Sequence, residues 1–338
     1  MAAATLPSEM RALLHNIKDQ SLVIKSVPLP IPGPQEYLVK PLAAAFTVGE
    51  LFWPRPEELS VSTPGVEYVG QIVQSPSATS KFQRGDRVYA RVTYPRPGAA
   101  RQYTVTTEDE IARTPRNFTT AEAASVPVSA LAAWQALFEE FKIEVPTINS
   151  THSSSTRPRL LITAASGSVG IYAVQLAKLA GLYVVATAGP RNIDLVKSLG
   201  ADEVLDYTTT DLRTWVAEDP SRRKVDFAFA LAGGSSLEQA WHTVKDNGQL
   251  LTIVPPPDFN WVFDLDTPDG VSSAVTGRFW IMHPSGAQLE KITELIEAGK
   301  LRPLVDSVWE FEDYNKAIER LNSGKTSGKV VLKVNAEQ

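Results

Sequence analysis

The chain has 338 residues, no cysteine and a formal net charge of −5. This length exceeds the usual size of one hydrophobic core, so two domains are expected, and the lack of cysteine excludes disulfides, a thiolate nucleophile and a thiolate zinc site. The basic residues form no cluster, which argues against a nucleic-acid partner. No apolar run reaches the length of a membrane span, which argues against a membrane partner. Because the N-terminus lacks the features of a signal peptide, the composition predicts a cytosolic protein.

The first 130 residues have the pattern of a small β domain. Short alternating runs such as Leu22–Val27 and Tyr68–Gln74 are separated by proline and glycine, as half-buried strands are by turns. A turn at Gly85 and Asp86 precedes a further strand.

A helical region and a linker follow. Thr120–Phe138 has apolar residues at helical spacing, with a break at Pro127. Glu144–Arg159 is rich in serine and threonine and contains two prolines, so it is expected to be an exposed loop.

Leu160–Gly181 carries the most informative pattern: a buried strand, a tight turn and a helix. Gly167 and Gly170 let the backbone approach a ligand closely, and the amides and dipole at the start of the helix attract phosphate. A strand-to-helix corner needs small residues for packing alone, so the turn by itself is weak evidence. The residues predicted to hold a pyrophosphate are Ser166, Gly167, Ser168, Val169 and Gly170.

The next elements extend this pattern to β, α, β, α, the order of a mononucleotide-binding unit. Tyr183–Thr187 predicts the second strand and Asn192–Leu199 the second helix. A site that prefers NAD carries Asp or Glu at the end of this second strand, but no acidic residue occurs between Ile171 and Ile193.

The segment after this strand instead favours NADPH. Gly189 leaves room and Arg191 supplies a guanidinium for a 2′-phosphate, with Lys197 and Tyr207 as weaker candidates for the same pocket. The alternative is that Arg191 is a solvated loop charge.

The alternation continues toward the C-terminus. Val225–Leu231 and Gln249–Val254 predict further strands, with a helix over Leu237–Val244 between them. Beyond Gly286 the pattern predicts two helices, an extended segment and a final strand, and this tail is expected to rejoin the first domain.

Seven motifs occur in order along the chain: Pro64–Gly70, Gly85–Val88, Ala121–Pro127, Leu131–Leu137, Ala165–Gly170, Leu199–Asp202 and Gly324–Val331. Taken together, they resemble the medium-chain dehydrogenase/reductase superfamily, in particular its zinc-independent branch of quinone oxidoreductases and enoyl reductases. The resemblance covers nearly the whole chain. The segment from Asn192 to Tyr207 and the serine- and threonine-rich insertion are similar to fungal trans-acting enoyl reductases.

The resemblance implies an α/β fold with a GroES-like β domain and a Rossmann domain, whose sheet is doubly wound and parallel. The GroES-like catalytic domain would comprise residues 1–130 with 285–338, and the NADPH-binding domain residues 131–284. Ala232, Gly233 and Val254 would place backbone against the nicotinamide ribose and ring. The chain would be a monomer or a homodimer.

Two departures from the superfamily matter. Its zinc alcohol dehydrogenases carry Gly-His-Glu where this chain has Gly65, Val66 and Glu67, and the four histidines show no ligand spacing, so no metal is expected. In addition, positions that are usually polar in the quinone reductase branch hold Phe52 and Ala132, while Thr47 keeps a hydroxyl.

These implications predict hydride transfer from NADPH to an α,β-unsaturated carbonyl without a metal, in fungal secondary metabolism. Thr47, Tyr94, the cofactor ribose hydroxyl or water would supply the hydrogen bond and the proton, and the sequence does not choose among them. Phe52 and Trp53 would contact the substrate, which would be a small molecule or a polyketide on a carrier domain. The alternatives are an NADP-dependent quinone reductase, a metal-free alcohol dehydrogenase, or a noncatalytic NADPH-binding protein. Glu67 would hold a water or an arginine, or form a structural ion pair.

Overall fold

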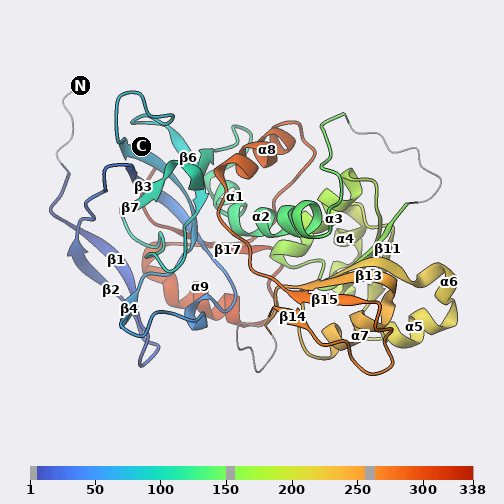
Figure 1. The fold of residues 1–338 in the computed structure, drawn as a ribbon. Helices are drawn as coiled ribbons and strands as arrows, with labels where there is room; N and C mark the ends of the chain where they lie inside the picture. Colours follow the sequence, from blue (N-terminus) through green and yellow to red (C-terminus); the bar gives the residue numbers. More distant parts are fainter. Residues whose placement is uncertain (1–5, 150–156, 256–262, 338) are drawn as a thin grey trace. The chain divides into compact units, whose positions relative to one another are not determined.

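The computed structural model describes residues 6–149, 157–255 and 263–337, and the chain divides into two compact units (Figure 1). Unit 1 comprises Met1–Leu131, His283–Glu297 and Pro303–Gln338. Unit 2 comprises Ala132–Met282 and Ala298–Arg302. Within the described ranges, no helix has the length and apolarity needed to cross a membrane.

Unit 1 is built mainly of β-strands. Its larger sheet has the order β16, β17, β3, β5, β6, β8, with β7 paired to β3; β2, β1 and β4 form a smaller sheet. Buried aromatic side chains such as Tyr37, Phe46 and Tyr68 fill its core. The strands are β1 (Glu9–Asn16), β2 (Leu22–Pro28), β3 (Glu36–Phe46), β4 (Val61–Ser62), β5 (Glu67–Gln74), β6 (Arg87–Arg91), β7 (Thr104–Thr107), β8 (Ile111–Arg113), β16 (Val305–Trp309) and β17 (Lys329–Lys333).

A strand from the C-terminal part of the chain joins this sheet beside a strand from the N-terminal part. β17 pairs antiparallel with β3, with Val330 opposite Phe46 and Lys333 opposite Ala43. This register brings Lys329, the first residue of β17, next to Thr47, which directly follows β3. The helices of unit 1 are α1 (Thr120–Ala124), α8 (Gly286–Glu297) and α9 (Tyr314–Asn322).

The helical region predicted around Pro127 is confirmed. Thr119 and Glu122 form a capping box that begins α1, and α2 (Pro127–Gln135) starts directly at the proline. A π-helical turn, Ala136–Glu140, continues α2 into unit 2.

Unit 2 is a doubly wound α/β domain. Its sheet has the order β11, β10, β9, β12, β13, β15, β14; every neighbouring pair from β11 to β15 is parallel, and β14 is antiparallel at the edge. The predicted fold class is therefore confirmed. The strands are β9 (Arg159–Ile162), β10 (Tyr183–Ala188), β11 (Glu203–Asp206), β12 (Val225–Ala230), β13 (Val244–Thr252), β14 (Asp264–Leu265) and β15 (Thr276–Phe279).

Helices cover both faces of this sheet. α3 (Ser168–Leu179) and α4 (Ile193–Ser198) lie on one face, and α5 (Leu212–Glu218) and α7 (Ser235–Thr243) on the other (Figure 1). The sequence interpretation missed α5 and the short α6 (Pro220–Arg223) that follows it. The signal was present, because the Asp211 carboxylate accepts hydrogen bonds from the amides of Arg213 and Thr214 as an N-cap.

Candidate functional site

The five residues predicted to bind a pyrophosphate lie in the turn after β9 and in the first turn of α3. Gly167 precedes α3, no side chain caps this helix, and its first turn contains no acidic residue. The first amides of a helix have no intrahelical acceptors, so here they are suited to bind an anion. A Cβ on Gly170 would lie 2.6 Å from the Cα of Ala165, so the close packing of α3 on the turn also requires glycine.

The loops after β10 and β11 gather beside this turn. The Asn192 side chain donates a hydrogen bond to the Ser166 hydroxyl at 3.1 Å, which ties the loop after β10 to the turn after β9. Tyr207 follows β11 and lies against Gly189, where an added Cβ would be 3.4 Å from the tyrosine ring. The structure thus brings Ser166, Gly189 and Tyr207 to one edge of the sheet, the carboxyl ends of its parallel strands.

The two predicted cations extend from this edge. Arg191 lies on the 3-10 turn Pro190–Asn192 and is exposed; no hydrogen bond or ion pair of its guanidinium is found among the described residues. Lys197 is exposed on α4. No carboxylate lies at the end of β10, because the strand ends at Ala188 and Gly189 follows it.

The remaining predicted cofactor residues follow the next two strands. Ala232 and Gly233 come after β12 and Val254 after β13, and a Cβ on Gly233 would lie 2.9 Å from Cγ1 of Val254. The buried Thr163 hydroxyl accepts hydrogen bonds from the amides of Leu231 and Ala232, at 2.9 and 3.3 Å. Thr163 therefore fixes the end of β12 beside the turn, a role the sequence interpretation missed although a polar residue after an apolar strand was visible.

Unit 1 contains a buried charged cluster around Thr47. The Lys329 ammonium lies 2.5 Å from a Glu67 carboxylate oxygen and donates a hydrogen bond to the Thr47 hydroxyl at 2.9 Å. The side chains of Lys329 and Glu67 are 4% and 0% exposed. The other Glu67 oxygen accepts a hydrogen bond from the amide of Val128 at 2.9 Å, so this carboxylate also caps the start of α2. Of the roles expected for Glu67, the structure shows the ion pair.

Two more buried charges complete this cluster. Glu50 accepts hydrogen bonds from the amides of Thr47 and Gly65, at 3.0 and 2.8 Å. Burial lowers the pKa of Arg91 to about 10, while Glu110 and Glu67 favour its charged form. Burial raises the pKa of Glu67, and the Lys329 ammonium opposes this shift. The sequence interpretation missed Lys329, Glu50 and Arg91. The pairing of β17 with β3 places Lys329, the pairing of β5 with β6 places Arg91 opposite Glu67, and Glu50 lies on the 3-10 turn Glu50–Phe52 just after Thr47.

Glu50 makes the stability of the protein depend on pH. Burial raises its pKa from 4.5 to about 7, against the opposing effect of the two amides. Between these two values the folded state binds more protons than the unfolded state, so stability falls as the pH rises. We expect Glu50→Gln to remove the contribution of Glu50 to this decrease in unfolding free energy with rising pH. Urea unfolding measured across that pH range provides the test. Parallel pH curves for the variant and the wild type would contradict this assignment.

Tyr94 forms hydrogen bonds to the loop that follows Thr47. The Tyr94 hydroxyl donates toward the carbonyl oxygens of Pro54 and Trp53, at 2.5 and 3.2 Å. Its ring also meets the Trp53 ring edge to face, with centroids 5.6 Å apart. Phe52 on the same loop is 71% exposed. The structure therefore brings Trp53 and Tyr94 together, and the tyrosine proton is already engaged by backbone.

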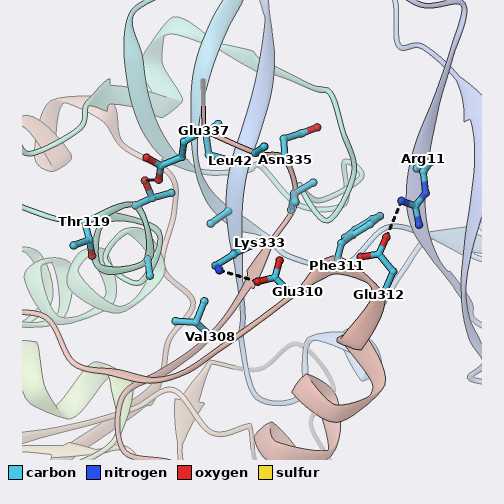
Figure 2. Close-up of a pocket in the computed structure, with 15 residues that line it drawn as sticks. Arg11, Leu42, Thr119, Val308, Glu310, Phe311, Glu312, Lys333, Asn335 and Glu337 are labelled. Carbon is cyan, nitrogen blue, oxygen red and sulfur yellow. Dashed lines mark hydrogen bonds and ion pairs between the residues drawn. The ribbon is translucent and has the colours of Figure 1, made fainter.

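A pocket of about 550 Å³ in unit 1 lies apart from these residues. It is lined by the end of β17, the start of α1 and the segment around Glu310, and contains none of the predicted site residues. Figure 2 shows two ion pairs in its lining, Lys333 with Glu310 and Arg11 with Glu312, and both are 2.7 Å long; Glu337 instead accepts a hydrogen bond from the Thr120 hydroxyl. This pocket does not offer the chemistry expected of the reaction.

Comparisons with known proteins define the family. A profile described as "Zinc-binding dehydrogenase" matches residues 199–332. A protein of Arthroderma benhamiae named "Probable zinc-binding oxidoreductase, mitochondrial" is 39% identical, covering 99% of this chain and 100% of the relative. The "Quinone-oxidoreductase homolog, chloroplastic" of Spinacia oleracea is 32% identical, covering 91% and 93%. The human "NAD(P)H oxidoreductase RTN4IP1, mitochondrial" is 30% identical, covering 80% and 70%.

A solved structure shows the same fold. The quinone oxidoreductase from Coxiella burnetii superposes with a TM-score of 0.79 at 23% identity, covering 97% of this chain and 100% of that chain. The chain belongs to the zinc-binding dehydrogenase family of the medium-chain dehydrogenase/reductase superfamily, and it is an oxidoreductase of the quinone-oxidoreductase-like branch. The predicted resemblance is confirmed.

The predicted cytosolic location is wrong. The relatives from Arthroderma benhamiae and Spinacia oleracea are named mitochondrial and chloroplastic, which contradicts the prediction. Composition misled the prediction because the absence of a secretory signal does not distinguish the cytosol from an organelle.

The family name implies zinc, but the residues of this chain do not fit it. There is no cysteine, and the described part of the chain holds no group of three or more His, Cys, Asp or Glu side chains arranged for a metal. Val66 stands where the resemblance expects an imidazole, and the neighbouring Glu67 is already neutralised by Lys329.

Proposed function

We propose that the chain is an NADPH-dependent, metal-independent oxidoreductase that reduces a carbon–carbon double bond conjugated to a carbonyl group. The observation that carries the proposal is the uncapped start of α3 at a glycine turn, flanked by an exposed arginine and no carboxylate after β10. Relatives named NAD(P)H oxidoreductases support the use of a nicotinamide cofactor.

In this proposal, the residues at the carboxyl ends of the parallel strands of unit 2 hold the cofactor. The amides of Ser166–Gly170 bind the pyrophosphate, and Arg191, with Lys197 or Tyr207, binds the 2′-phosphate. Gly189 leaves space beside Tyr207. Ala232, Gly233 and Val254 place backbone and a small apolar side chain against the nicotinamide ribose and ring. When bound, NADPH supplies the hydride.

Thr47 assists the acceptor. Addition of a hydride at the β-carbon would move the electron pair of the double bond so that negative charge develops on the carbonyl oxygen, and the Thr47 hydroxyl would donate a hydrogen bond to that oxygen. The α-carbon would then take a proton from water, giving the saturated carbonyl compound. Thr47 is preferred to Tyr94 because the Tyr94 hydroxyl is already bound to backbone carbonyls. Phe52 and Trp53 are proposed to contact the acceptor through their rings.

A quinone is the second candidate acceptor. Relatives named quinone oxidoreductases favour it. A quinone also carries a carbonyl conjugated to a double bond, so the same hydrogen bond from Thr47 serves it. A narrower form of the proposal places the enzyme in fungal secondary metabolism, with the acceptor held as a thioester on a polyketide carrier domain.

The test is NADPH oxidation, followed by the loss of reduced-nicotinamide absorbance, with an enone, an α,β-unsaturated thioester, a quinone and a saturated aldehyde. NADH is the matched control. Turnover of the enone or thioester supports the proposal, whereas turnover of quinones alone selects the second candidate. Tight NADPH binding without turnover of any acceptor would overturn both and favour a noncatalytic binding protein.

Arg191→Ala tests the choice of cofactor. The substitution is expected to weaken NADPH binding by about 1–3 kcal/mol, because a charge-assisted hydrogen bond to the 2′-phosphate is lost, and to leave NADH binding nearly unchanged. Arg222→Ala, which removes the same charge from an exposed position of unit 2, is the control. Equal losses for NADPH and NADH in titrations of cofactor fluorescence would refute the role of Arg191.

A further inference from the structure

We propose that Lys329 is a positioning residue that makes the Thr47 hydroxyl a hydrogen-bond donor to the substrate. This inference rests on the proposed function, since it assigns a cause to the role of Thr47. It concerns a residue at the opposite end of the chain, placed beside Thr47 only by the pairing of β17 with β3.

The ammonium of Lys329 is surrounded by protein oxygens. It forms an ion pair with the Glu67 carboxylate at 2.5 Å and donates hydrogen bonds to Thr47 Oγ1 at 2.9 Å and to the carbonyl oxygen of Phe46 at 3.5 Å. The side chain is only 4% exposed. Because it is buried among these partners, Lys329 is shielded from a substrate and is expected to act through the groups that it contacts.

Lys329 contacts the Thr47 hydroxyl, which can either donate or accept a hydrogen bond. A threonine hydroxyl has one proton and two lone pairs, and a cationic donor beside the oxygen occupies a lone pair. The Thr47 proton must then point away from Lys329. Among the described residues no acceptor takes that proton, and Thr47 is only partly buried, so the proton is available to a ligand.

The same contact strengthens the donor. A positive charge beside the oxygen in a buried, low-dielectric environment polarises the O–H bond. The hydrogen bond from Thr47 to a developing oxyanion is therefore stronger than the bond that a threonine without this neighbour would form. Glu67 keeps the ammonium in place, and the Glu50 carboxylate fixes the backbone of Thr47 through its amide. The arrangement is a preorganised donor built from both ends of the chain.

A double-mutant cycle tests the inference. Replacing Lys329 alone would leave Glu67 buried without a partner, so the pair is replaced together as Glu67→Gln with Lys329→Met. The cycle compares the wild type, Thr47→Val, the pair variant, and all three substitutions combined. Measured quantities are kcat and KM for the acceptor turned over by the wild type, and the Kd of NADPH.

The pair variant is expected to lose at least tenfold in kcat with the Kd of NADPH unchanged, and the triple variant to be no slower than Thr47→Val, because both changes act through one hydroxyl. Losses that multiply, or an unchanged kcat in the pair variant, would overturn the inference and leave the pair a purely structural one. A wild type that turns over no acceptor would instead overturn the proposed function.

Binding of 4-nitrophenolate, an oxyanion probe, gives a readout that needs no turnover. The wild type is expected to bind it more tightly than the uncharged 4-nitroanisole, and the pair variant to lose that preference. No preference in the wild type, or a preference kept by the pair variant, would overturn the inference.

Discussion

Thr47→Val is expected to lower kcat by about 10²–10³-fold, the usual effect of removing one donor to a developing oxyanion. Valine keeps the shape of threonine and removes only the hydroxyl. The Kd of NADPH is expected to stay unchanged, because the residues proposed to hold the cofactor belong to unit 2. Steady-state kinetics with the acceptor identified for the wild type provide the measurement.

Thr47→Ser is the matched control for that experiment. Serine keeps a hydroxyl beside Lys329, so most of the activity is expected to return. If the valine and serine variants were equally slow, a hydroxyl at this position would not restore activity, and the proposed donor role of Thr47 would be contradicted. If both were as fast as the wild type, another group would donate to the acceptor.

Glu67→Gln is expected to cost about 3–5 kcal/mol of unfolding free energy, because it leaves the Lys329 ammonium buried without a counter-charge. The ion pair is 2.5 Å long and almost fully shielded from water. Adding Lys329→Met to the same chain removes the uncompensated charge, so most of the lost stability is expected to return. Urea unfolding of both variants provides the comparison.

The same strand offers a control pair. Lys333 and Glu310 lie 2.7 Å apart with side chains 56% and 62% exposed. Water screens such a pair, so Glu310→Gln is expected to cost less than about 1 kcal/mol. Equal losses from Glu310→Gln and Glu67→Gln would mean that burial does not set the energy of the inner pair.

Much of unit 2 was predictable because its signals are local. The strand, glycine turn and helix over Leu160–Gly181 lie within one continuous stretch, and the parallel order of the following strands comes from short β–α–β connections. The helix α5 was missed, although its N-cap Asp211 is an equally local signal. The cofactor roles of these residues remain predictions that the Arg191 and acceptor experiments address.

The buried cluster of unit 1 is a different case. Glu67 and Thr47 were singled out from motifs, yet their partners Lys329, Glu50 and Arg91 were not. Lys329 is separated from Thr47 by most of the chain, and nothing in the spacing of charged residues shows that the two meet. Tyr94 was also a reasonable candidate for a free hydroxyl until its contacts with the Pro54 and Trp53 carbonyls were visible.

The sequence by itself determined the α/β class and the position of the glycine turn, because these depend on short-range patterns of apolar residues and glycine. The superfamily came from the resemblance of its ordered motifs to a known family. Tertiary structure decided which charges are buried and what each polar atom binds. The reason is physical: the state of a buried ammonium or carboxylate depends on water exclusion and on partners within a few ångströms. In this chain, the antiparallel pairing of β17 with β3 supplies those partners from opposite ends of the sequence.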